Sequence, residues 1–289
     1  MIVDRRVLAL VTVLMLAGCG EPAPRTVPPP SPAPVRSPIV EAEPVAVPGA
    51  ARAGSVPAVV QHGSRDVKRV ALTFDADMTD AMTARLRRGE VKSYANLRLL
   101  GILEKRRIPA TFFVTGQWAE QYPDVTRRIV GNPLFEVANH SYEHAAFTGD
   151  CYNLPRVKPA DMTEDVAKTF RVLEPFGGRQ TRYFRFPGLC HDRAALTALA
   201  PLGVTVVDGD VVSGDPFARG PEPVVDAVLS QVKPGSIVIM HVTEANALYT
   251  DDALPAILAG LRRRGLEPVT LSELLAGRRA DVSPLPGAP

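Results

Sequence analysis

The sequence has 289 residues and contains little of several residue types. Aromatic residues make up 6%, with a single Trp, and there are only three Cys and five His. The formal net charge is +2, and no Lys or Arg run or basic stretch with interleaved aromatic residues is present, so binding to nucleic acid is not predicted. The hydrophobic content of 46% is enough for one large core, of the size that a single α/β barrel needs.

The first residues have the pattern of an export signal. Arg5 and Arg6 precede an apolar run at 7–17, which is too short to span a bilayer but suits the core of a signal peptide. The run ends in Leu16-Ala17-Gly18-Cys19, which resembles the lipobox of bacterial lipoproteins. We therefore predict a lipoprotein signal peptide at 1–18, acylation of Cys19, and an extracytoplasmic protein that is anchored to the cell membrane without spanning it. A plain secretory signal with an incidental Cys is the alternative.

Composition also predicts the domain organisation. Residues 19–60 comprise the lipidated Cys and a linker rich in Pro, Ala and Val, which favours extended conformations that reach on the order of 100 Å. Such a tether would let a folded domain act on a cell-wall polymer, although a disordered spacer without that role fits the composition equally well. We place one folded domain at 61–278, a flexible tail at 279–289, and expect a monomer.

Strand-like and helix-like stretches alternate along the domain. Short β-branched, aromatic and apolar runs predict strands at 68–74, 110–115, 134–138, 183–186, 204–207, 236–240 and 268–269. Helical spacing and end signals predict helices at 94–106, 126–130, 163–173, 193–200, 221–231, 252–264 and 271–275. This alternation is typical of an α/β fold with a parallel sheet, here a barrel or near-barrel, in which functional side chains gather where strands end.

Two His residues form the most informative local pattern. His140 and His144 are four residues apart, a spacing that places both imidazoles on one face of a helical turn, from which both can point at one metal ion. Asp75 directly follows the strand predicted at 68–74, and His241 ends another strand-like run. A hydrolytic zinc site is therefore predicted where the carboxyl ends of the strands meet. Each His taken alone would more often be a surface or cap residue, but their coincidence favours a site.

An ordered set of motifs then resembles a known family. The strings are Thr73-Phe74-Asp75, Asn139-His140-Ser141-Tyr142-Glu143-His144, Arg185-Phe186-Pro187-Gly188, Ser213-Gly214-Asp215 and Ile239-Met240-His241. They are similar to the five motifs of the polysaccharide deacetylases of carbohydrate esterase family 4, the NodB-homology domain, over residues 66–276. The resemblance implies an irregular (β/α) barrel and a hydrolase that removes N-acetyl, or alternatively O-acetyl, groups from a glycan with the help of a divalent metal. We expect Zn²⁺ as the metal and a cell-wall or other extracellular glycan as the substrate, above all the amino sugars of peptidoglycan.

The resemblance also implies catalytic roles. Asp75 would be the general base that activates a water beside the metal, and Arg185 would hold Asp75 ionised and oriented. The Gly188 N–H would stabilise the oxyanion of the tetrahedral intermediate. His241 would protonate the departing amine, and Asp215 would raise the pKa of His241. Two neighbouring carboxylates, at positions 208 and 210, are alternatives for this last role.

The sequence departs from the family in two places. His140 and His144 match metal ligands, but Ala76 stands where the family supplies its third ligand from an Asp. Side chains alternate along a strand, so Asp77 shares a face with Asp75, and we predict that Asp77 replaces the missing ligand. If the chain turned directly after Asp75, two His and water would hold the ion. The second departure is Phe217, which follows the fourth motif near the place of a Trp and could provide similar apolar cover.

Two other functions fit parts of the sequence. The string from His140 to His144 also matches H-x-x-E-H, a zinc-peptidase signature in which a regular helix presents Glu143 as the base. The absence of Asp at position 76 allows instead a catalytically weak or inactive lipoprotein that binds a wall glycan. Acetate release separates the deacetylase from the binding protein, and peptide cleavage would reveal the peptidase.

The remaining cysteines are predicted to pair. Once Cys19 is acylated, Cys151 and Cys190 are the thiols that remain, and two thiols in an oxidising exported setting usually form a disulfide. One follows the His motif and the other follows Arg185, so both should lie near the same rim. Two free buried thiols, or thiolate metal ligands, are the alternatives.

Overall fold

The computed structural model describes residues 47–276. The predicted signal peptide, the lipidation site Cys19, the predicted tail and most of the predicted linker lie outside the described residues. In the described part of the chain, no helix is both long and apolar enough to cross a membrane.

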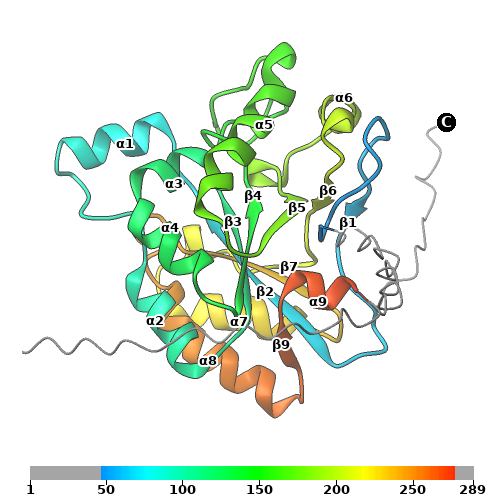
Figure 1. The fold of residues 1–289 in the computed structure, drawn as a ribbon. Coiled ribbons are helices and arrows are strands. Elements are labelled where there is room, and N and C mark those ends of the chain that lie inside the picture. The colour runs from blue at the N-terminus through cyan, green and yellow to red at the C-terminus, as the bar shows by residue number, and fades with distance from the viewer. Residues whose placement is uncertain (1–46, 277–289) are drawn as a thin grey trace, which may run out of the picture. The chain divides into compact units, whose positions relative to one another are not determined.

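One sheet of nine strands organises the fold, and all of its strand pairings are parallel. The strands run in the order β1-β6-β5-β4-β3-β2-β8-β7, and β9 pairs with β2. The sheet curls into a barrel (Figure 1). The barrel is open, because within residues 47–276 the end strands β1 and β7 do not pair with each other. The α/β class and the irregular (β/α) barrel predicted from the sequence are confirmed. The strands are β1 Val59–Val60, β2 Arg69–Ala76, β3 Ala110–Val114, β4 Phe135–Asn139, β5 Gln180–Phe184, β6 Thr205–Val207, β7 Val211–Val212, β8 Ile237–His241 and β9 Glu267–Val269.

Helices surround the sheet (Figure 1). They are α1 Asp80–Arg87, α2 Leu97–Arg106, α3 Gly116–Gln121, α4 Pro123–Val130, α5 Met162–Leu173, α6 Arg193–Ala198, α7 Pro221–Gln231, α8 Thr250–Arg263 and α9 Leu271–Leu275. The helix predicted at 94–106 begins later, at Leu97, because the Asn96 side chain accepts a hydrogen bond from the Leu99 N–H at 2.9 Å and caps the helix there. Helix α1 was not predicted from the sequence.

Apolar side chains fill both sides of the curled sheet. Seven of the eight residues of β2 are buried, which is typical of a parallel strand that is covered on both faces. The larger cluster joins the sheet to α2, α4, α7 and α8, and a smaller one lies beside α5 and α6. A third cluster, which includes Phe113, Tyr183 and Ile237, is closed by Leu271 and Leu274 of α9. Each fully buried large apolar side chain stabilises the folded state by roughly 1.5–3 kcal/mol. The three clusters together therefore hold the strands, and the rim formed by their carboxyl ends, in place.

The folded part starts earlier than residue 61, because residues 47–60 of the predicted linker pack against the domain. Strand β1 pairs with β6, the Arg182 N–H donates to the Pro48 carbonyl at 2.7 Å, and the Ala51 N–H donates to the Gly203 carbonyl at 2.8 Å. The two Val residues of β1 suit the edge of a sheet. This strand was not predicted, because the segment before it is rich in Pro and resembles a linker.

The strand register sets the positions of the site residues. Asp75 of β2 lies directly beside His241 of β8, and Val114 of β3 lies beside Asn139 of β4. All strands are parallel, so their carboxyl ends share one rim. The turns after β2, β4, β5, β6 and β8 therefore bring their side chains to the same place.

Candidate functional site

A pocket opens at the carboxyl ends of the strands. Its lining includes six of the residues singled out from the sequence: Asp75, Asp77, His140, His144, Gly188 and His241. Arg185 and Asp215 are buried and contact Asp75 and His241, respectively. The structure thus brings together all eight residues that the sequence assigned to catalysis and metal binding.

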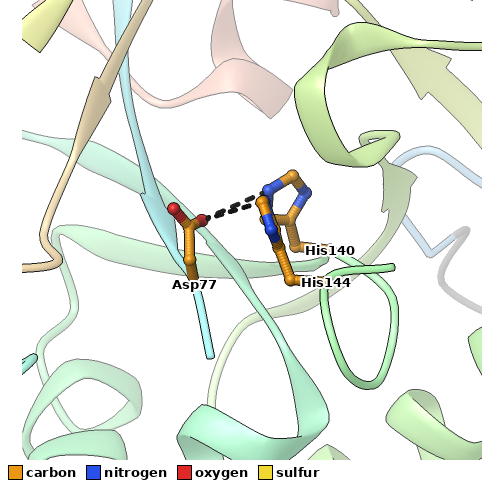
Figure 2. Close-up of side chains that lie close together, drawn as sticks. All are labelled: Asp77, His140 and His144. Carbon is orange, nitrogen blue, oxygen red and sulfur yellow. Dashed lines mark ion pairs between the residues drawn. The ribbon is translucent and has the colours of Figure 1, made fainter. Parts of the chain in front are cut away.

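Asp77, His140 and His144 form a compact group of possible metal ligands (Figure 2). The Asp77 Oδ1 atom lies 3.5 Å from the His140 Nε2 and 3.4 Å from the His144 Nε2. One ligand atom from each residue lies within 4.8 Å of the others. Within the described residues the Asp77 Oδ1 atom is buried and has no hydrogen-bond partner, although a buried carboxylate oxygen is normally paired. Two imidazoles and a carboxylate that converge in this way fit a divalent metal such as zinc.

The loop after β4, rather than a helical turn, presents the two imidazoles. Ser141 and His144 have positive φ angles of 71° and 54°, so the expected helical turn at 140–144 is wrong. The Asn139 side chain accepts from the Ser141 N–H, and Asp165 accepts from the Tyr142 N–H, each at 2.9 Å. These side-chain contacts supply partners that a helix would have supplied from its own backbone.

Hydrogen bonding and burial prepare both imidazoles for metal binding. The His140 Nδ1 lies 2.9 Å from the Arg185 carbonyl oxygen, and because that oxygen can only accept, Nδ1 carries the proton and Nε2 keeps a free lone pair. Burial lowers the pKa of His144 to about 4, although the Asp77 carboxylate acts in the opposite direction. The His144 ring is therefore a neutral ligand at neutral pH.

A buried ion pair orients Asp75. The Arg185 Nη1 donates to the Asp75 Oδ1 at 2.5 Å, and the Arg185 Nε donates to the Val207 carbonyl at 3.1 Å. The guanidinium lies 4.0 Å from the centroid of the Phe113 ring and has no solvent exposure. The second carboxylate oxygen, Oδ2, lies 3.6 Å from the His140 Nε2, so it faces the group of metal ligands. A carboxylate held in this way can accept a proton beside a metal.

A second buried pair joins His241 to Asp215. The His241 Nδ1 lies 2.8 Å from the Asp215 Oδ1, and the Asp215 Oδ2 accepts from the His241 backbone N–H at 2.8 Å. The hydroxyls of Ser213 and Thr250 also donate to this carboxylate, at 2.7 and 2.6 Å. Burial alone would lower the pKa of His241, but the Asp215 and Asp77 carboxylates outweigh it and raise this pKa to about 10. His241 is therefore a cation at neutral pH and can donate a proton from its ring.

The structure also places the other two candidate carboxylates. Asp208 lies 3.0 Å from the Nε2 of His191, and Asp210 pairs with Arg65 at 2.7 Å. Neither carboxylate contacts His241, so Asp215 is the partner of that imidazole.

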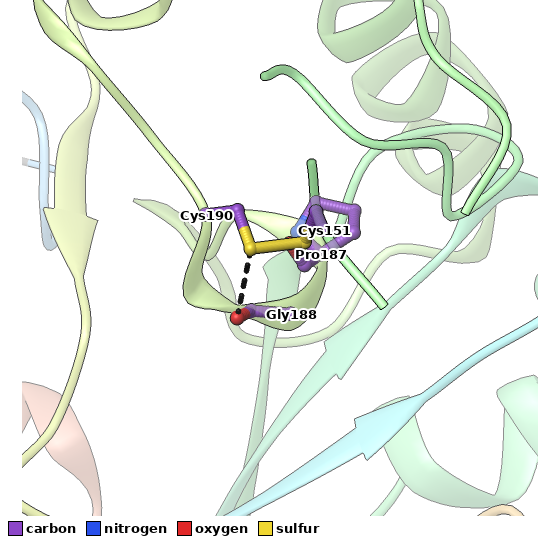
Figure 3. Close-up of a disulfide and its surroundings, with 4 residues drawn as sticks. All are labelled: Cys151, Pro187, Gly188 and Cys190. Atoms are coloured by element: carbon purple, nitrogen blue, oxygen red, sulfur yellow. Dashed lines mark hydrogen bonds between the residues drawn. A yellow bond between two sulfur atoms is a disulfide. The ribbon is translucent and has the colours of Figure 1, made fainter. Parts of the chain in front are cut away.

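A tight turn carries Gly188 to the pocket wall. Gly188 has a φ of 61°, and a Cβ atom there would lie 2.6 Å from the Cys151 Sγ and 2.9 Å from the Tyr152 Cδ2. Only glycine fits this backbone conformation and this close approach. The turn is tied to the loop after β4 by a disulfide between Cys151 and Cys190 (Figure 3).

Replacing both Cys151 and Cys190 with Ser is expected to lower the free energy of unfolding by roughly 4 kcal/mol in the chain-entropy model. The two cysteines are 39 residues apart in the sequence, so the disulfide restricts a long loop in the unfolded chain. Denaturant unfolding of the oxidised protein and of the double variant measures the difference. A titration that finds both side chains as free thiols in the unreduced, denatured protein would exclude the disulfide.

Comparison with known proteins decides the family. The family model for polysaccharide deacetylases matches residues 62–207, just over half of the chain. The chain belongs to the polysaccharide deacetylase family. Over 188 residues it is 30% identical to a chitooligosaccharide deacetylase of Bradyrhizobium sp. (strain ANU 289), a match that covers 61% of this chain and 82% of that protein. Over 185 residues it is 28% identical to a peptidoglycan-N-acetylglucosamine deacetylase of Bacillus cereus, with 61% and 62% covered.

A solved relative shares the fold. A pseudoenzyme of carbohydrate esterase family 4 from Bacillus anthracis superposes with a TM-score of 0.60 at 24% identity, over 78% of this chain and 71% of that chain. The family model and the two relatives named as deacetylases confirm the family and the enzyme class, a glycan deacetylase, that were predicted from the motifs.

Sequence reasoning missed several residues that shape the pocket. Thr243 accepts a hydrogen bond from the Asp77 N–H at 3.0 Å and so holds Asp77 just beyond the end of β2. Thr250, the first residue of α8, supports Asp215 by donating a hydrogen bond from its hydroxyl. Tyr152 lines the pocket from the loop after β4, and its position next to Cys151 was the one available signal.

Proposed function

We propose that this protein removes N-acetyl groups from the amino sugars of a bacterial cell-wall glycan, with peptidoglycan as the expected substrate and Zn²⁺ as the expected metal. One arrangement carries the proposal: the Asp77, His140 and His144 group faces both Asp75 and His241 in a single pocket. Buried partners hold these two residues, Arg185 for Asp75 and Asp215 for His241. The relatives named for chitooligosaccharide and peptidoglycan deacetylation support an N-acetylated glycan as the substrate.

The residues of the pocket divide the work of amide hydrolysis. A divalent metal held by Asp77, His140 and His144 would supply Lewis acidity, which polarises the acetyl carbonyl and acidifies a water. Asp75 takes the proton of the attacking water, and the ion pair with Arg185 holds the Asp75 carboxylate in place. The Gly188 N–H, at the wall of the pocket, stabilises the oxyanion that develops on the carbonyl oxygen. The His241 ring donates its proton to the departing amine, while Asp215 holds the ring and balances its charge.

We further propose that the domain acts outside the cytoplasm while anchored through a diacylated Cys19. The lipobox-like string and the Pro-rich segment that follows it support this location. A lipid anchor and a long tether would place the pocket within reach of a wall polymer.

The geometry weakens the peptidase alternative. That function needs a regular helix that presents Glu143 between the two His ligands, whereas residues 140–144 form a loop with two positive φ angles. It would also leave Asp75, Arg185 and His241 without a role. An inactive glycan-binding protein remains the second candidate, because the pseudoenzyme from Bacillus anthracis has the same fold.

Acetate release is the decisive test of the proposed function. Purified protein should release acetate from peptidoglycan or N-acetylglucosamine oligomers, lose this activity after chelation, and regain it with Zn²⁺. Acetylated xylan in the same screen tests O-acetyl hydrolysis. Binding of the glycan without acetate release would favour the inactive protein, and cleavage of a peptide would favour the peptidase.

A further inference from the structure

Two exposed aromatic rings stand together at the mouth of the catalytic pocket. Among the residues that the structure describes, Tyr152 and Phe217 are the two exposed aromatic side chains, with 67% and 73% exposure. Their ring centroids lie 6.0 Å apart with an interplanar angle of 27°. Both rings line the same pocket as the metal-ligand group. The two exposed aromatic rings therefore lie together beside the proposed metal ligands. An exposed apolar patch at such a position indicates a binding surface.

The backbone holds Tyr152 in place at some energetic cost. Tyr152 and Asn153 have left-handed φ angles of 51° and 58°, which are uncommon for residues other than glycine. The disulfide of Cys151 fixes the preceding residue, and the Leu154 N–H donates to the Cys151 carbonyl at 2.9 Å. The Tyr152 ring rests against Gly188, where a Cβ atom would lie 2.9 Å from the Tyr152 Cδ2. The ring therefore lies next to the proposed oxyanion donor.

The Phe217 side of the pair is tied to the proposed general acid. Phe217 ends the short turn Asp215–Phe217, and its N–H donates to the Gly214 carbonyl at 3.0 Å. Asp215 in the same turn holds the His241 ring. The stacked rings thus join the turn that carries the proposed oxyanion donor to the turn that supports the proposed general acid.

We infer that Tyr152 and Phe217 form an aromatic platform that stacks against the pyranose ring adjacent to the ring that carries the reacting acetyl group. The inference rests on the proposed function and specifies its substrate as an oligosaccharide of more than one ring. The C–H groups on one face of a pyranose make an apolar surface that packs on aromatic rings, while its hydroxyls stay in water. The platform is part of the catalytic pocket, and this identifies its ligand. When one sugar of a glycan enters the pocket, the neighbouring sugar must lie at the pocket mouth, where the two rings are. The platform acts in binding, so it contributes to KM rather than to the chemical step.

The test measures KM and kcat for acetate release from N-acetylglucosamine oligomers of increasing length. Tyr152→Ala and Phe217→Ala are each expected to raise KM for the tetramer roughly tenfold, with kcat changed by less than about twofold. Tyr152→Phe should restore the parent KM, whereas Tyr152→Leu, which keeps apolar bulk without a ring, should not. Leu97→Ala is the matched control, because Leu97 is 53% exposed on α2 and is not among the pocket residues.

The outcomes separate the platform from the proposed function. If the parent protein releases acetate but both Ala variants keep its KM for the tetramer, the platform is wrong and the proposed function stands. If the parent releases no acetate from any glycan, the proposed function fails, and calorimetric binding of the intact tetramer then tests the platform. Roughly tenfold weaker binding to Tyr152→Ala would support it, and no binding to the parent or equal binding to both would overturn it.

Discussion

Replacing Asp75 with Asn is expected to lower kcat for deacetylation by a factor of roughly 10² to 10⁴. Asn keeps the size of the side chain and an oxygen that Arg185 can contact, but it cannot take a proton from water at neutral pH. The buried Arg185 loses its counter-charge in this variant, so circular dichroism and denaturant unfolding must accompany the kinetics. Initial rates of acetate release, measured with saturating substrate and metal, give kcat.

The same loss of kcat is expected for His241→Ala, which removes the proton donor for the departing amine. Asp208→Asn is the matched control, because this carboxylate lies at the same rim but pairs with His191 instead of contacting the two proposed catalytic residues. Near-normal turnover in both Asp75→Asn and His241→Ala would contradict the assignment of base and acid. A similar loss in Asp208→Asn would show that disturbing any carboxylate at the rim is sufficient.

Much of the site could be predicted because its residues follow buried strands. Apolar runs locate strands well, and the carboxyl ends of parallel strands share one rim whatever the details of packing. Asp75, Arg185 and His241 lie at or just after strand ends, so their proximity follows from the α/β pattern and the order of the motifs. The α/β class and the open barrel follow from the same alternation.

Other features depend on contacts between segments that are distant in the sequence. The spacing of His140 and His144 suggested a helical turn, but side chains from neighbouring elements, such as Asp165, stabilise a loop there. Three carboxylates near one another in the sequence could each have served His241. Only the fold shows that Asp215 contacts the His241 ring, with Thr250 and Ser213 holding Asp215 in place. Strand alternation did indicate that Asp75 and Asp77 share a face, although β2 ends at Ala76.

Replacing Asp77 with Ala is expected to weaken Zn²⁺ binding by roughly 10²-fold or more, since loss of a second-shell partner alone costs 10- to 100-fold. The alternative is that His140 and His144 hold the metal with water, because the family's Asp position is occupied by Ala76. The position of Asp77 favours the first result: burial would raise the pKa of its carboxyl, yet His144, His241 and His140 together lower this pKa below its ordinary value. The carboxylate is therefore ionised at neutral pH and faces both proposed His ligands.

Competition with a chromophoric chelator gives the Zn²⁺ affinity of Asp77→Ala and of the parent protein, and the rise of Tm with added Zn²⁺ gives an independent measure. Glu143→Gln is the matched control, because it removes a carboxylate from the same His motif without touching the group of ligands. The control should keep both the affinity and the metal-dependent rise in Tm, whereas Asp77→Ala should lose most of each. Unchanged affinity in Asp77→Ala would show that the two imidazoles bind the ion without a carboxylate. A loss in Glu143→Gln alone would instead move the carboxylate ligand to Glu143 and reopen the peptidase function.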